Sequence, residues 1–68
     1  MSKYTLEGKD GNAYAVIGYT AESLKRVGLA DIVDAYIEDA ESQDYNHLLY
    51  VSQRMIKRCN QKHEEESS

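Results

Sequence analysis

The chain has 68 residues, of which 29% are charged and 41% are hydrophobic, and its formal net charge is −4 at pH 7. This length allows one domain at most and limits the surface that the chain can bury on its own. The negative charge argues against broad binding to nucleic acids.

A core this small usually needs a disulfide, a metal or a partner subunit for support. Cys59 is the only cysteine, which excludes a disulfide within the chain and favours a reducing compartment. His47 and His63 lie sixteen residues apart, which is not the spacing of a zinc site, so we expect neither a metal nor another cofactor. Self-association remains, and we therefore expect a homo-oligomer.

Nothing in the sequence predicts a membrane partner. The longest apolar run, at 13–17, is too short to span a bilayer. Residues 1–9 lack the apolar stretch of a signal peptide. Together with the lone thiol, these features predict a cytoplasmic protein.

Residues 4–20 allow two interpretations. Residues 4–7 alternate and are rich in strand formers, and the turn cluster that follows contains Asp10-Gly11, so a β-hairpin is one of them. Asn12 is also a good helix N-cap, and helical spacing places six residues on one face: Ala13, Val16, Ile17, Thr20, Leu24 and Val27. We predict a short extended segment and then a helix over 13–27, with Gly28 at its end and Gly18 as its weak point.

Two more helices follow. The first covers 32–41 after the N-cap candidate Asp31, and its acidic side chains face water: Asp34, Glu38, Asp39 and Glu41. The second covers 45–61 and has the clearest apolar stripe: Tyr45, Leu48, Leu49, Ser52, Met55, Ile56 and Cys59. The predicted fold is mainly α, a compact three-helix domain over 1–63 with a short extended N-terminal segment. Residues 64–68 form an acidic stretch that we expect to be disordered.

The third predicted helix carries the main candidate site. Residues 45–63 contain four basic residues and no acidic one. Helical spacing gathers seven residues opposite the apolar stripe: His47, Tyr50, Val51, Arg54, Lys57, Arg58 and Gln61. Cations beside an aromatic ring suit a flat anionic ligand such as a nucleotide, because arginine binds phosphate bidentately and tyrosine stacks on a base. The alternative is that the cations offset the helix dipole while Tyr50 and Val51 pack on another helix or subunit.

Two further places are weaker candidates. The glycine turn at 9–12 would expose backbone N–H groups where a helix begins, so Lys9, Asn12 and the neighbouring Tyr14 are candidate anion-binding residues. Gly18 would leave a shallow strip beside Ala15 and Glu22, where a ligand or another backbone could approach closely. Six tyrosines without Phe or Trp support a binding surface, with Tyr4, Tyr14, Tyr19 and Tyr50 beside or away from the core stripes.

Enzyme signatures are not seen in the sequence. It contains no nucleophile elbow, no phosphate-binding glycine loop and no paired metal ligands. The carboxylates spread along faces expected to be in water. We therefore predict a protein that is not an enzyme.

Two motifs resemble those of a known group of proteins. The segment Asp-Gly-Asn-Ala-Tyr at 10–14 and the segment Asp-Tyr-Asn-His-Leu at 44–48 are similar to segments in short uncharacterised proteins encoded in phages, prophages and their bacterial hosts. The resemblance covers residues 4–59 and singles out Asn12 and His47. It implies an accessory phage protein that acts in the host cytoplasm, where small non-enzymatic phage proteins often counter host defences, some by sequestering nucleotide signals.

Three functions remain open. The first is a homo-oligomeric binding module for a small anionic ligand, such as a signalling nucleotide. The second is a protein–protein inhibitor whose acidic face mimics nucleic acid or covers a basic partner. The third is a small DNA-binding regulator that uses the third helix, although the acidic body makes nucleic acid a poor partner.

Overall fold

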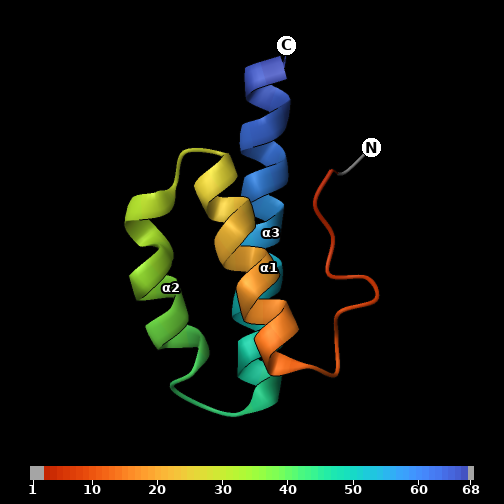
Figure 1. The fold of residues 1–68 in the computed structure, drawn as a ribbon, viewed down its shortest axis with the longest axis vertical. Coiled ribbons are helices and arrows are strands. Elements are labelled where there is room, and N and C mark those ends of the chain that lie inside the picture. Colours follow the sequence, from red (N-terminus) through yellow and green to blue (C-terminus); the bar gives the residue numbers. More distant parts are fainter. Residues whose placement is uncertain (1–2, 68) are drawn as a thin grey trace.

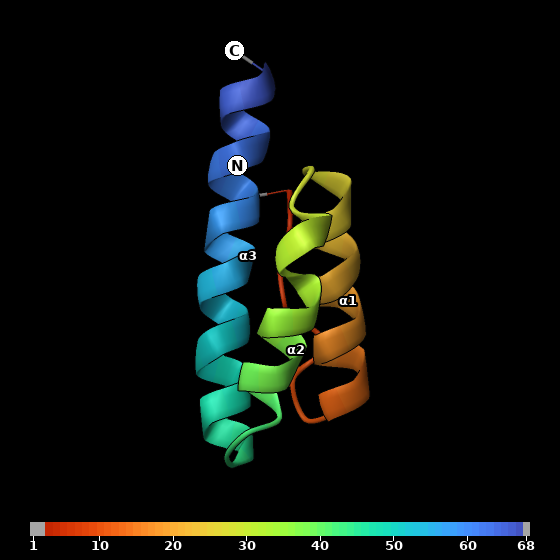
Figure 2. The same cartoon turned by 90° about the vertical axis from the view of Figure 1, so that its left-hand side faces the viewer.

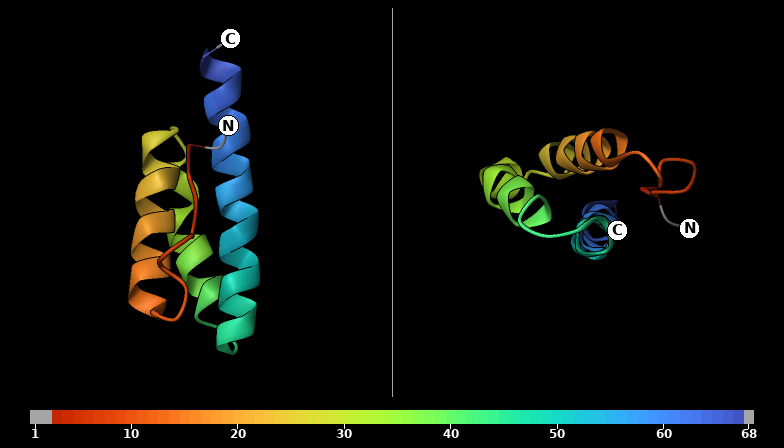
Figure 3. Two further views of the ribbon diagram at one scale, coloured as in Figure 1. Left: turned by 90° about the vertical axis from the view of Figure 1, so that its right-hand side faces the viewer. Right: turned by 90° about the horizontal axis from the view of Figure 1, so that it is seen from below.

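The computed structural model describes residues 3–67 and confirms the mainly α class (Figure 1). The helices are α1 (Ala13–Arg26), α2 (Val33–Ala40) and α3 (Tyr45–Ser67), with a 3₁₀ turn at Ala30–Ile32 before α2. α2 lies across α1 and α3 on one side (Figure 2), and the N-terminal segment runs along the same pair on the other side (Figure 3). The hairpin interpretation of 4–20 is wrong, because residues 3–67 contain no strand.

Residue chemistry fixes both ends of α1. The side-chain oxygen of Asn12 accepts a hydrogen bond from the Ala15 N–H at 3.2 Å, which makes Asn12 the N-cap. At the other end, Gly28 has a φ of +84°, and the Leu29 N–H donates to the Leu24 carbonyl at 2.8 Å. This arrangement is a Schellman motif, in which the left-handed backbone conformation favours glycine.

The N-terminal segment packs more tightly than its sequence predicts. Tyr4 and Leu6 are buried, although Tyr4 was expected to lie beside the core or face away from it. The side-chain amide of Asn60 on α3 accepts from the Tyr4 N–H at 2.8 Å and donates to the Tyr4 carbonyl at 3.0 Å. The Tyr19 hydroxyl accepts from the Thr5 N–H at 3.0 Å. The segment is therefore fixed to both α1 and α3.

Two core assignments are also wrong. Val51 was placed on the outer face of the third helix but is buried, because α2 packs on a second side of α3. Ala13 was placed on the core face of the first helix but is exposed, because it lies in the first turn of α1, at the end of the bundle. The buried apolar side chains come from all three helices and the N-terminal segment: Tyr4, Leu6, Val16, Ala21, Leu24, Val27, Val33, Tyr36, Ala40, Leu48, Val51, Ile56 and Cys59.

α3 is longer than its prediction. It continues to Ser67, whereas the sequence predicted an end near residue 61 and a disordered stretch from 64 onward. Glutamate is a good helix former, and Lys62 and Glu66 stand four residues apart with Nζ and Oε1 separated by 4.0 Å. The helix therefore extends past the other two (Figure 1), and Ser68 lies outside the described residues.

A buried hydrogen bond joins α2 to α3. The Tyr36 hydroxyl and Ser52 Oγ are 2.5 Å apart, and both side chains are buried. We expect Tyr36→Phe or Ser52→Ala alone to lower the free energy of unfolding by about 1–3 kcal/mol, because each leaves a buried hydroxyl without its partner. The free energy of unfolding of the double variant should be only slightly lower than that of either single variant. Urea unfolding checks this, and strictly additive losses would contradict it.

Candidate functional site

Five side chains of α3 form an outward surface that we call the basic face: Tyr50, Arg54, Lys57, Arg58 and Gln61. With Met55 they line a shallow hollow of about 590 Å³, and all five are exposed. None of the described residues that line this hollow carries a carboxylate. The hollow is therefore open to water and positively charged.

Tyr50 and Arg54, the first two residues of the basic face along α3, interact with each other. The Arg54 guanidinium donates to the Tyr50 hydroxyl at 3.3 Å, and its carbon lies 5.8 Å from the centre of the Tyr50 ring. This spacing of four residues places the side chains one above the other on the helix. Tyr50 remains 59% exposed, so part of its ring is open to a ligand.

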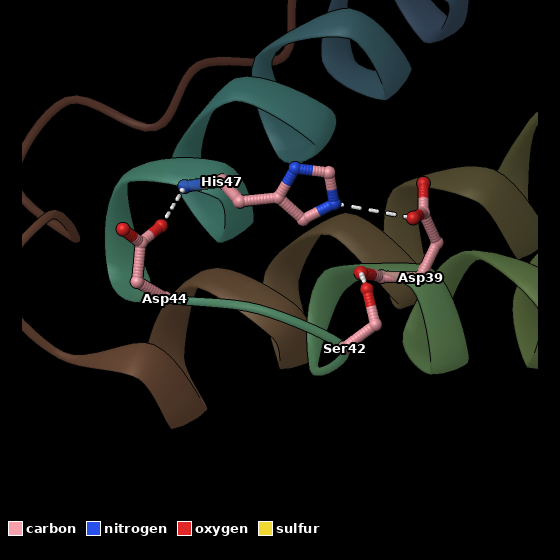
Figure 4. Close-up of polar contacts among 4 residues, drawn as sticks. All are labelled: Asp39, Ser42, Asp44 and His47. Atoms are coloured by element: carbon pink, nitrogen blue, oxygen red, sulfur yellow. Dashed lines mark hydrogen bonds and ion pairs between the residues drawn. The ribbon is translucent and has the colours of Figure 1, made fainter.

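His47 does not line the hollow of the basic face, and its ring points toward Asp39 on α2 (Figure 4). Its Nε2 lies 3.1 Å from Oδ1 of Asp39, and its backbone N–H donates to Oδ1 of Asp44 at 2.9 Å. Asp44 thereby caps the first turn of α3. His47 connects two helices in this arrangement, which the spacing along one helix could not reveal.

The turn at 9–12 does not line the hollow of the basic face, but Asp10 lines a neighbouring hollow that also includes Lys57 and Gln61. The Lys9 ammonium stands 4.3 Å above the centre of the Tyr19 ring on α1. The Gly11 N–H donates to the Tyr45 hydroxyl, and Asn12 caps α1. Two of the groups expected to attract an anion are therefore engaged within the chain: the Gly11 N–H and the Lys9 side chain.

Tyr14 stands in a different groove, which sequence reasoning missed. We call it the Tyr14 groove; its apolar lining includes Tyr14, Ile17, Tyr45 and Leu48, and its acidic side chains are Glu41 and Asp44. The Tyr14 side chain is 91% exposed. The groove forms where the start of α1, the end of α2 and the start of α3 meet, so no single helix pattern contains it.

Gly18 has no close neighbour that would explain it. A Cβ added there would meet no heavy atom within 4 Å. The residue lines a hollow with Tyr4, Tyr19, Glu22, Ser23 and other residues, whereas Ala15, which was expected beside it, is not among them. The close approach that this glycine would allow is not used within the described chain.

Two further observations concern metal ligands and the single cysteine among the described residues. Residues 3–67 contain no group of three or more His, Cys, Asp and Glu side chains able to hold a metal ion. Burial raises the pKa of the Cys59 thiol, although the nearby Arg58 charge acts in the opposite direction. The thiol form is favoured, and a thiol is a poor nucleophile. In the part of the chain that the structure describes, no helix has the length and apolar character needed to cross a membrane.

Comparison of the chain with protein-family models, curated proteins and solved structures found no match.

Proposed function

We propose that the protein is a non-catalytic binding protein whose basic face takes up a small anionic ligand of the nucleotide type. The supporting observation is the gathering of Arg54, Lys57 and Arg58 around one hollow beside the exposed Tyr50 ring. Arginine can bind a phosphate through two parallel hydrogen bonds, and the tyrosine ring offers a stacking surface for a base. The phage resemblance would make such a protein a counter-defence factor that sequesters a nucleotide signal.

The length of α3 weakens the alternative explanation for these cations. A basic side chain offsets the helix dipole mainly within the last turn. α3 ends at Ser67, and its last turn contains no basic residue. Arg58, the later of the two arginines, lies at least two turns before that end. Stabilisation of the helix dipole therefore does not account for Arg54 and Arg58. This supports a role for both arginines as ligands for an anion.

Calorimetric titration with ADP, pyrophosphate and adenosine tests the proposal. Arg54→Ala and Arg58→Ala should each cost about 1.5–3 kcal/mol of affinity for ADP and pyrophosphate, as expected for the loss of a charge-assisted hydrogen bond. Tyr50→Ala should weaken the binding of ADP and leave that of pyrophosphate nearly unchanged. Stability should stay within about 0.5 kcal/mol of the parent chain, because these side chains are exposed.

Lys25→Ala provides the matched control, because Lys25 is an exposed cation in the last turn of α1, outside the hollow. It should bind both anions like the parent chain. An equal loss in this variant would point to overall charge instead of a site. If neither anion binds at millimolar concentration, the proposal is wrong.

A protein–protein inhibitor is the second candidate, and the acidic surface of α2 favours it. Asp34, Glu38, Asp39 and Glu41 are all exposed on or directly after this short helix. Such a surface could cover a basic partner. Charge reversal at Asp34 and Glu38 would abolish inhibition of such a partner and leave ADP binding intact, which separates the two candidates.

We also expect the chain to self-associate. Its Cα trace extends 37 × 25 × 14 Å, so the body is thin along one axis. A chain of this size buries a limited share of its surface, and the exposed Tyr14 and Tyr50 side chains are ones that a second copy could cover.

A further inference from the structure

Two large apolar side chains are exposed among those that the structure describes, and they stand on separate surfaces. Tyr14 is 91% exposed and lines the Tyr14 groove, whereas Tyr50 is 59% exposed and belongs to the basic face. Tyrosine is common in interfaces, because its ring supplies contact area and its hydroxyl a hydrogen bond. Each surface thus holds one aromatic side chain that the chain itself leaves uncovered.

The two surfaces have opposite charge. Glu41 and Asp44 line the Tyr14 groove, and none of the described residues that line it is basic. Arg54, Lys57 and Arg58 line the basic face, where the described lining residues include no carboxylate. Opposite potentials on two surfaces of one molecule favour contact between copies, since each copy then offers what the next one lacks.

We propose that a second copy of this chain docks its basic face into the Tyr14 groove. One such contact would cover Tyr14 of one copy and Tyr50 of the other, and would bring the arginines near Glu41 and Asp44. The proposal deepens the self-association proposed above and does not depend on a nucleotide ligand. The arrangement that we propose is heterologous, so that each added copy leaves one groove and one basic face open until a ring closes.

Two variants, each lacking one surface, test this arrangement. The groove variant carries Tyr14→Ala and Glu41→Lys, and the face variant carries Arg54→Glu and Arg58→Glu. The parent chain should show a mass above that of a dimer by light scattering at high micromolar concentration. Each variant alone should show the monomer mass of 7.7 kDa, because its one intact surface finds no complement. Mixed in equal amounts, the two should form a heterodimer and stop there.

The mixture is the decisive measurement, because a contact between identical surfaces would not be restored by mixing. A control with Lys25→Glu and Arg26→Glu changes the net charge as much as the face variant does, but on exposed positions of α1. It should assemble like the parent chain. Circular dichroism on each variant verifies that the helices remain.

Several results would overturn the proposal: a monomeric parent chain, a groove or face variant that assembles like the parent, a control variant that is also monomeric, or a mixture that stays monomeric.

The ligand proposal has a test of its own. The groove variant keeps Tyr50, Arg54 and Arg58, so it should bind ADP as a monomer if the basic face is a nucleotide site. In the groove variant, a monomer that binds ADP would support both proposals, and a monomer that fails to bind ADP would contradict only the ligand.

Discussion

Leu24→Ala is expected to leave little folded protein at 25 °C. Leu24 is fully buried in α1, among the largest of the buried side chains. Replacing a buried leucine with alanine costs about 2–5 kcal/mol, through lost transfer energy and the cavity that remains. A core in a domain of fewer than about 70–80 residues rarely supplies more than about 3–5 kcal/mol. The substitution therefore removes most of the stability, which urea unfolding followed by circular dichroism would measure.

Leu49→Ala gives the comparison for this effect. Leu49 lies on α3 and is only partly buried, so the same change of side chain removes fewer packing contacts. It should cost clearly less than Leu24→Ala, since less area is returned to water. A loss below about 1 kcal/mol for Leu24→Ala would contradict the described core, because full burial of this side chain predicts a larger one.

Asn60→Leu should have the second large effect, because it releases the N-terminal segment. The substitution removes both hydrogen bonds to the Tyr4 backbone and leaves a partly buried donor and acceptor without partners. We expect a loss of about 1–3 kcal/mol in the free energy of unfolding. The exchange of the Tyr4 amide hydrogen should also become faster, which nuclear magnetic resonance would detect.

Gln61→Leu is a matched control for this prediction. Gln61 also has an amide side chain and lies next to Asn60, but it is exposed. Its replacement should change stability by less than about 0.5 kcal/mol, as for most surface positions. If Asn60→Leu were equally harmless, the N-terminal segment would contribute little to the folded state.

The three helices could be predicted because each carries its own apolar period. Asn12 and Gly28, which cap and end α1, are local signals of the same kind. The burial of Tyr4 could not be predicted in this way, since its partner Asn60 is 56 residues away in the sequence. The position predicted for Val51 was wrong for a related reason, because only the packed structure reveals that α2 covers a second side of α3.

The candidate site residues also differ in whether the sequence could predict their positions. Tyr50, Arg54 and Arg58 belong to one helix, so their spacing alone places them on one surface, as the structure has it. Lys9 and His47 depend on neighbours from other elements, Tyr19 and Asp39, which their own segments do not indicate. The Tyr14 groove is built from the ends of three helices and becomes visible only once they are packed.

The bond between Asn60 and Tyr4 has a consequence for how the protein is made. A ribosome synthesises Tyr4 among the first residues of this sequence and Asn60 among the last, yet each holds the other in place. Chains leave the ribosome at about 5–20 residues per second, so Tyr4 and Leu6 wait several seconds without their final cover. The N-terminal segment can dock only after residue 60 has emerged from the exit tunnel. The first residues of this domain to be synthesised are therefore the last to reach their folded positions.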